Sequence, residues 1–121
     1  MIVAIIGASK DRSKFGNKAV RAYKSFGSEV VPVNSNEAEI EGLKAYRSVL
    51  EYPKRIDVAS FYVRPEIGIK IADEIIKKGI RKAYLNPGAD SEDIYNKLTG
   101  AGVEALRECS IRAIGMSPET L

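Results

Sequence analysis

The chain of 121 residues contains no histidine and a single cysteine, Cys109. A lone cysteine cannot form an internal disulfide or a cysteine-rich metal site, and no other metal-ligand spacing is present. Because no histidine is available to activate Cys109, we interpret it as a buried structural side chain; a thiolate stabilised by Arg107 or Arg112 is the alternative. The sequence therefore predicts neither a metal site nor catalytic residues.

Long apolar segments are also missing. No apolar run approaches the roughly 20 residues that cross a membrane, and the chain opens on a strand pattern without the basic region and cleavage site of a secretory signal. We therefore expect a cytoplasmic protein with no membrane contact. Tryptophan and glutamine are absent while isoleucine, lysine and glutamate are abundant, a usage that resembles that of thermophile proteins.

Basic and acidic residues occur in nearly equal numbers. The chain has 19 lysine and arginine residues and 16 aspartate and glutamate residues, so its net charge is +3. This charge is mild for a nucleic-acid-binding protein, and we expect no nucleic-acid partner. With 121 residues the chain is long enough for one core and too short for two, which predicts a single domain over residues 1–121.

Strand-like and helix-like segments alternate along the chain. The strand segments are largely apolar, as expected for strands that are buried on both faces of a sheet. We predict strands at residues 2–6, 29–33, 57–63, 82–86 and 103–106, and a short strand at 43–46. We predict helices at residues 13–26, 65–78 and 90–98.

Capping residues mark several of the helix ends. Ser13 is the predicted N-cap of the first helix, and Gly27 is a suitable residue just beyond its end. Pro65 suits the first position of the second helix. That helix has four isoleucines that we expect to share one face: Ile67, Ile71, Ile75 and Ile76.

This alternation predicts an α/β fold, Rossmann-like and doubly wound, with a mainly parallel sheet and helices on both faces. In such sheets a ligand binds beyond the carboxyl ends of the strands, where the winding direction reverses. Polar or turn-forming residues follow four of the predicted strands, at 7–9, 33–34, 63–65 and 86–88. We therefore expect any binding site to lie at these strand ends.

The first of these strand ends, Gly7-Ala8-Ser9, is the best candidate for a phosphate site. A strand that ends on glycine just before a helix brings free N–H groups and the positive end of the helix dipole together. Glycine also lets a pyrophosphate approach the backbone, and four basic residues surround the turn: Lys10, Arg12, Lys14 and Lys18. A tight turn that binds nothing, with solvated lysines, is the alternative.

An ordinary NAD site is disfavoured. The dinucleotide fingerprint has further glycines two and five positions after the first, where this chain has Ser9 and Arg12. NAD enzymes also place an acidic residue at the end of the second strand to hold the ribose diol, and this chain has Asn34 there. A neutral amide tolerates a phosphorylated ribose better than a carboxylate does.

In their order and spacing, several segments resemble the CoA-binding domain family, small proteins similar to the CoA-binding part of the succinyl-CoA synthetase α-subunit. The resemblance covers nearly the whole chain. It is carried by residues 5–9, 31–34, 42–46, 57–58 and 63–66, with 86–88 and 108–109 in the positions of the family's later loops. One departure is Ser35-Asn36, where the family often has Pro-Lys, so a lysine contact from this loop is missing.

The resemblance implies that coenzyme A binds at the strand ends. Its pyrophosphate would lie near residues 7–9 and 14–17, its adenine between the tips at 33–34 and 62–63, and its pantetheine toward 86–88. The implied binding residues are Gly7, Ala8, Ser9, Lys10, Ser13, Lys14, Phe15, Gly16, Asn17, Val33, Asn34, Tyr62, Val63, Arg64, Asn86, Pro87 and Gly88. The larger relatives' ligase chemistry uses a phosphorylated histidine on a separate domain, and this chain contains no histidine.

The leading hypothesis is therefore a protein that binds CoA or an acyl-CoA and acts as a carrier, sensor or detached subunit without catalysis of its own. A protein partner or a homodimer would suit such a role. Two alternatives stay open: an NAD(P)-binding, oxidoreductase-like protein, and a partner-binding module that has no ligand.

Overall fold

Five parallel strands form the centre of the protein in the computed structural model, which describes residues 1–121. They are β1 (Ile2–Ile6), β2 (Glu29–Val33), β5 (Val58–Phe61), β6 (Lys82–Leu85) and β7 (Glu104–Leu106). The strands lie in the order β2-β1-β5-β6-β7, and every neighbouring pair is parallel. The winding direction reverses between β1 and β5, which confirms the predicted Rossmann-like α/β fold.

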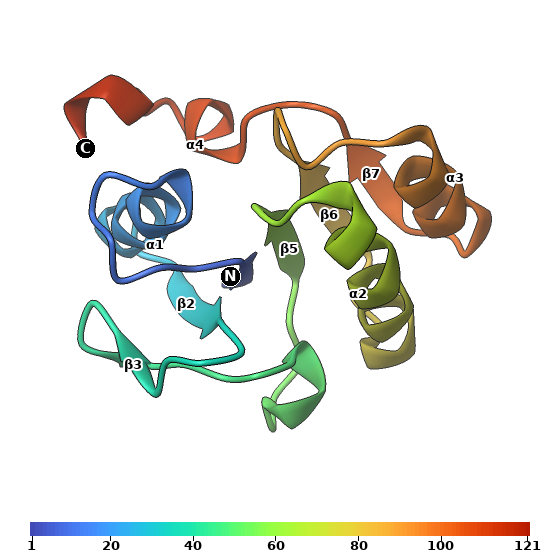
Figure 1. The fold of residues 1–121 in the computed structure, drawn as a ribbon, viewed down its shortest axis with the longest axis horizontal. Coiled ribbons are helices and arrows are strands. Elements are labelled where there is room, and N and C mark those ends of the chain that lie inside the picture. The colour runs from blue at the N-terminus through green and yellow to red at the C-terminus, as the bar shows by residue number, and fades with distance from the viewer.

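Helices cover both faces of this sheet. The four α-helices are α1 (Phe15–Ser25), α2 (Pro65–Lys78), α3 (Glu92–Gly100) and α4 (Ser110–Ala113). Two short 3₁₀ helices, η1 (Val49–Glu51) and η2 (Pro118–Thr120), and a hairpin of β3 (Glu39–Ile40) and β4 (Leu43–Lys44) complete the fold. In Figure 1, α1 and α4 lie together on one side of the sheet, and α2 and α3 lie together on the other.

The sheet separates two hydrophobic cores. Ala4 and Ile6 contribute to the core beneath α2 and α3, whereas Val3 and Ile5 contribute to the core beneath α1 and α4. This division follows from strand geometry, because successive side chains of a strand point to opposite faces. Burial on both faces explains why the strand segments are nearly continuous apolar runs.

The first helix begins later than the sequence predicted. Its N-cap is Lys14, which makes no side-chain capping bond. Ser13, the predicted N-cap, instead donates from its backbone N–H and its hydroxyl to Oδ1 of Asp11, at 3.0 and 2.6 Å. The local turn around Asp11 therefore competes with capping by Ser13.

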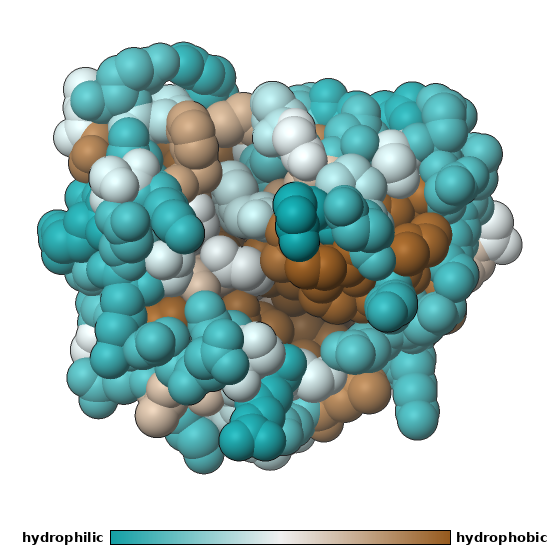
Figure 2. Space-filling view, viewed as in Figure 1, coloured by the Kyte–Doolittle hydropathy of each residue, from teal (hydrophilic) through white to brown (hydrophobic).

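The buried face of α2 also differs from the prediction. Gly68, Ala72 and Ile75 are buried, whereas Ile67 is 43% exposed. The packing against α3 explains the glycine, since a Cβ at position 68 would lie 3.0 Å from Cδ1 of Ile94. Figure 2 shows hydrophilic residues over most of this side of the molecule and a hydrophobic area over α2.

The segment 43–46, predicted as one short strand, divides its backbone pairing between two partners. Leu43 and Lys44 form β4 and pair with β3. Tyr46 makes an isolated parallel bridge to Val33, and so covers the outer edge of β2. The hairpin is thereby fastened to the edge of the sheet, close to the end of β1.

The first turn of α1 packs directly on the loop that follows β1. A Cβ at Gly16 would lie 2.2 Å from the carbonyl oxygen of Gly7, well inside contact distance. Only glycine therefore lets the helix sit so close to the strand end. This contact brings the N-terminus of α1 to the edge of the sheet where a ligand is expected.

We expect Gly16→Ala to destabilise the protein by about 1–3 kcal/mol, because the added methyl group meets backbone rather than a movable side chain. Urea unfolding measures the change. The matched control is Gly100→Ala in the last turn of α3, where an added Cβ meets nothing within 4 Å and should be neutral or stabilising. Equal destabilisation of the two variants would contradict this explanation.

Candidate ligand-binding site

A cavity of about 730 Å³ opens at the carboxyl ends of the strands. Its walls come from the loop after β1, the start of α1, and the tips of β2, β5, β6 and β7. The lining residues are Gly7, Ala8, Ser9, Ser13, Lys14, Phe15, Gly16, Asn34, Tyr62, Val63, Arg64, Asn86, Pro87, Gly88, Ala89 and Cys109. The cavity therefore spans the point between β1 and β5 where the winding direction reverses, as such folds predict.

The structure brings nearly all of the predicted binding residues together in this lining. Lys10, Asn17 and Val33 are the exceptions, and they lie outside it. Two residues of the lining were missed, Ala89 and Cys109. Cys109 follows the end of the last strand, and this position is the signal that could have identified it.

Cys109 is not the buried structural residue that the sequence suggested. It is half-buried, its thiol is free, and it forms part of the cavity wall. The loop after β7 turns back over the strand ends to reach α4, and this return places Cys109 beside Pro87 and Phe15, which share a smaller cavity with it.

Position 7 requires glycine for two reasons: its backbone conformation, and the lack of room for a side chain. Its φ is +88°, in the region that favours glycine, and a Cβ there would lie 2.9 Å from Cγ1 of Val63 and 3.0 Å from the carbonyl group of Tyr62. The expectation was that a side chain at Gly7 would fill the space of a bound pyrophosphate. The structure adds a reason that is independent of any ligand, because this side chain would collide with the tip of β5.

Asn17 holds the loop after β1, which is the candidate phosphate site, through buried hydrogen bonds. Its side chain is fully buried and donates from Nδ2 to the carbonyl oxygen of Ser9 at 2.8 Å and to Oε2 of Glu41 at 3.0 Å. Its Oδ1 accepts a hydrogen bond from Nε of Arg21 at 2.7 Å. The polar atoms of Asn17 are therefore all paired within the protein, and the residue holds the loop in place.

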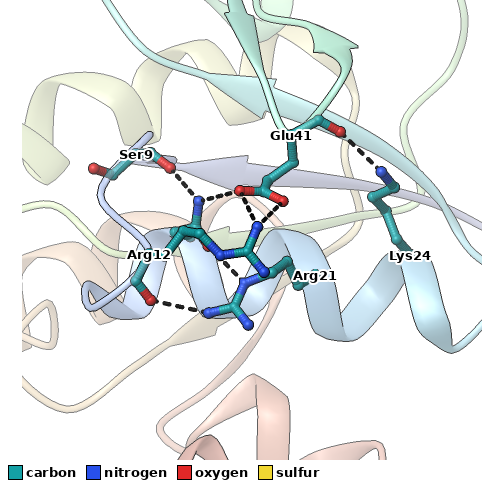
Figure 3. A network of polar contacts seen from close by, with 6 residues as sticks. Ser9, Arg12, Arg21, Lys24 and Glu41 are labelled. Carbon is teal, nitrogen blue, oxygen red and sulfur yellow. Dashed lines mark hydrogen bonds and ion pairs between the residues drawn. The ribbon is translucent and has the colours of Figure 1, made fainter. Parts of the chain in front are cut away.

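Glu41 joins the β3–β4 hairpin to the same loop (Figure 3). Its carboxylate pairs with the Arg12 guanidinium at 2.8 Å, and its backbone oxygen accepts from Nζ of Lys24 at 2.8 Å. The hydrogen bond from Asn17 and the charge of Arg12 hold the pKa of the Glu41 carboxyl below its usual value of 4.5. Glu41 adopts this position with a positive φ of 51°, which is uncommon for a residue other than glycine.

Asn34 fastens the other side of the loop. Its Nδ2 donates to the carbonyl oxygen of Ala8 at 2.8 Å, while its Oδ1 accepts from the backbone N–H groups of Asn36 and Glu37 at 2.7 and 2.9 Å. A carboxylate at this position would set a second oxygen against the Ala8 carbonyl. The amide at the end of β2 is therefore required by the loop itself, whatever ligand the cavity holds.

A network of polar side chains whose hydrogen-bonding groups are all paired lies beneath the cavity at the tips of β5 and β6. Asn86 donates from Nδ2 to Oγ of Ser60 and to the carbonyl oxygen of Phe61, and its Oδ1 accepts from the backbone N–H of Ser110. The Ser60 and Ser110 hydroxyls lie 2.6 Å apart. The network therefore joins β5 and β6 to α4, segments that are far apart in the sequence.

Two tyrosines extend this network. Tyr62 shares a hydrogen bond with the Ser110 hydroxyl at 2.9 Å, and Tyr23 of α1 donates to the Ser110 carbonyl oxygen at 2.8 Å. Burial raises the pKa of Tyr62 to about 12 and also raises the pKa of Tyr23. Both phenols therefore stay protonated at neutral pH and serve as hydrogen-bonding groups.

The charges around the cavity are divided unevenly. Lys14 and Arg64 line it and form no ion pair, whereas no carboxylate belongs to the lining. Two nearby carboxylates are paired with other cations, Glu37 with Lys10 at 2.9 Å and Glu41 with Arg12. A third, Asp11, accepts hydrogen bonds from Ser13 and interacts with the charge of Lys14. The cavity is therefore positive on the side of β1 and β5, and it carries no charged side chain at the tips of β6 and β7.

A family model described as "CoA binding domain" matches residues 2–115. The chain belongs to this CoA-binding domain family. The finding confirms the family that the sequence resembled, and it agrees with the Rossmann-like fold.

Several curated relatives of the chain are CoA ligases. The chain is 35% identical over 113 residues to an acetate–CoA ligase (ADP-forming) of Methanocaldococcus jannaschii, a match covering 93% of this chain and 16% of the ligase. It is 38% identical over 84 residues to the α subunit of acetate–CoA ligase (ADP-forming) II of Pyrococcus furiosus, which covers 69% of this chain and 18% of that subunit. The chain thus spans less than a fifth of the length of these relatives.

Solved structures of similar proteins share the fold. A conserved hypothetical protein of Pyrococcus furiosus is 46% identical, with a TM-score of 0.86, and the match covers 92% of this chain and 97% of that chain. Dinucleotide-forming acetyl-coenzyme A synthetase 1 of Candidatus Korarchaeum cryptofilum is 29% identical, with a TM-score of 0.78, over 88% of this chain and 25% of the synthetase.

None of the helices combines the length and the apolar character that crossing a membrane requires.

The environment of Glu41 predicts a pH effect on stability. Because the folded pKa of Glu41 is depressed, its contribution to the free energy of unfolding is present above about pH 4.5 and is lost as the pH falls through the folded pKa. We expect Glu41→Gln to lower the free energy of unfolding at neutral pH and to differ less from the wild type in acid. Urea unfolding of both proteins at about pH 3–7, a range chosen to include the titration of carboxyl groups, measures the difference in the free energy of unfolding.

The control for this measurement is Glu39→Gln in the same hairpin. The Glu39 side chain is exposed, and its carboxylate forms no ion pair, so we expect only a small change. A difference between Glu41→Gln and the wild type that stays the same from neutral to acid pH would show that the carboxylate charge is not what fastens the loop.

Proposed function

We propose that the cavity at the strand ends binds coenzyme A or an acyl-CoA. The observation that carries this proposal is the charge pattern of the lining, which has two unpaired cations, Lys14 and Arg64, and no carboxylate. A ligand with a multiply charged phosphate end and a neutral tail fits this pattern. The volume of about 730 Å³ is within the usual range for sites that hold ligands of this size.

The order of the strand tips suggests how the ligand lies. Neighbouring parallel strands are about 4.8 Å apart, so the tips from β2 to β7 extend over about 19 Å. The pyrophosphate would lie at Gly7–Ser9 and the N-terminus of α1, close to Lys14 and Arg64. The pantetheine would then run over Asn86–Gly88, and the adenine would lie between Asn34 and Tyr62.

The residues of the protein would bind and orient the ligand in this proposal. Backbone N–H groups at the start of α1 donate to phosphate oxygens, and the helix dipole favours the negative charge there. Asn17 and Asn34 keep those N–H groups in position by holding the loop. Lys10 and Val33 lie outside the lining. They would affect ligand binding only indirectly, Lys10 through the loop after β1 and Val33 through the end of β2.

We propose that the protein acts as a carrier, sensor or detached subunit that binds CoA, without catalysis by this chain and with a protein partner or a second copy. The relatives' names describe ligases and a ligase subunit, and this chain matches less than a fifth of their length. We also propose a cytoplasmic location. A thermophilic source is proposed from the composition, and the relatives from archaeal thermophiles agree with it.

Isothermal titration calorimetry with CoA and with NAD tests the proposal. We expect CoA to bind much more tightly than NAD, and we expect Lys14→Met and Arg64→Met each to weaken CoA binding by about 3- to 30-fold, since each removes a charge-assisted contact to phosphate. Lys77→Met, near the far end of α2, makes the same charge change and should leave the affinity unchanged.

Two outcomes would contradict the proposal. One is the absence of CoA binding up to millimolar concentration by a folded protein, which would favour a module without ligand. The other is equal affinity for NAD and CoA, which would favour the NAD(P)-binding alternative.

A further inference from the structure

A second, smaller cavity of about 260 Å³ adjoins the first. The two cavities share three wall residues, Phe15, Pro87 and Cys109. The smaller one lies between the start of α1 and the C-terminal segment that contains α4 and η2. It is therefore reached from the end of the main cavity that is formed by the tips of β6 and β7.

The smaller cavity lies where the acyl group of a bound CoA thioester would be, an inference that rests on the proposed function. If the phosphates of CoA lie against Lys14 and Arg64, the uncharged end of the main cavity holds the pantetheine. The thiol at the end of the pantetheine then points toward the shared wall at Pro87 and Cys109. Whatever is attached to that sulfur would enter the smaller cavity.

The smaller cavity combines apolar walls with an unpaired positive charge. Phe15, Pro87 and Pro118 contribute apolar surface. Arg112 forms an ion pair with Glu119, whose carboxylate also lines the cavity and interacts with the charge of Lys18. Lys18 has no ion pair, and its half-buried side chain places Nζ 5.4 Å from the centre of the Phe15 ring.

We propose that this smaller cavity holds the acyl group of a CoA thioester, and that it favours a short acyl chain that ends in a carboxylate. The methylene groups of such a chain would pack on Phe15 and the two prolines. The terminal carboxylate would pair with Lys18, which forms no ion pair, since the two cations of the lining, Lys18 and Arg112, outnumber its one carboxylate, Glu119. The free thiol of CoA would leave the cavity to water.

Calorimetric titration with three probes tests the proposal: CoA, valeryl-CoA and glutaryl-CoA. The two thioesters have acyl chains of equal length and differ in the terminal carboxylate. We expect glutaryl-CoA to bind about tenfold more tightly than CoA, because it buries methylene groups and forms an ion pair. We expect it to bind about threefold to tenfold more tightly than valeryl-CoA.

Variants of Lys18 assign this preference to the smaller cavity. Lys18 was expected beside the phosphate turn, but the structure places it in the lining of the smaller cavity and not of the main one. Lys18→Met should therefore remove the preference for glutaryl-CoA over valeryl-CoA and leave CoA binding unchanged. Lys18→Arg keeps the charge and should retain most of the preference. Lys77→Met is the control for an equal loss of charge elsewhere, and circular dichroism verifies the folding of each variant.

The outcomes separate the two proposals. Equal binding of all three probes by the wild type, or a glutaryl-CoA preference that survives in Lys18→Met, would overturn the acyl site and leave CoA binding intact. Failure of all three probes to bind would overturn the proposed function and the acyl site with it.

Discussion

The close contact between α1 and the loop after β1 is the constraint on which the cavity depends. Gly16 lies against the Gly7 carbonyl with no room for a Cβ, and a Cβ at Gly7 would in turn collide with the tip of β5. These two glycines bring a helix N-terminus and two strand ends into one place. Backbone N–H groups and the helix dipole then face the same space, which is the physical origin of anion binding in this kind of fold.

Side chains from distant segments keep that loop in position. Asn17 and Asn34 each donate to a backbone carbonyl of the loop, at Ser9 and Ala8. Glu41 reaches in from the β3–β4 hairpin and binds both Asn17 and Arg12. The loop is thus held by hydrogen bonds on two sides. The Gly7 and Ala8 N–H groups also donate to the Val33 carbonyl oxygen, so an anion would be bound mainly by N–H groups at the start of α1.

The other half of the cavity has a different chemistry. Asn86, Ser60 and Ser110 satisfy one another beneath it, and α4 is thereby fixed over the ends of β5 and β6. A network whose members are all paired is rigid and offers no unpaired charge to the ligand. The cavity therefore has a cationic end and a neutral end, and in the proposed function this asymmetry sets the direction in which CoA would lie.

The sequence by itself determined the alternation of strands and helices, the parallel sheet and the strand ends at which the cavity lies, because buried strands, turn glycines and capping residues are local signals. Only the tertiary structure decided which polar groups remain free. Asn17 was assigned to the ligand and is instead buried against Glu41, and Cys109 was expected to be buried and instead lies on the cavity wall. The partners in these contacts are far apart along the chain, so no local pattern specifies them.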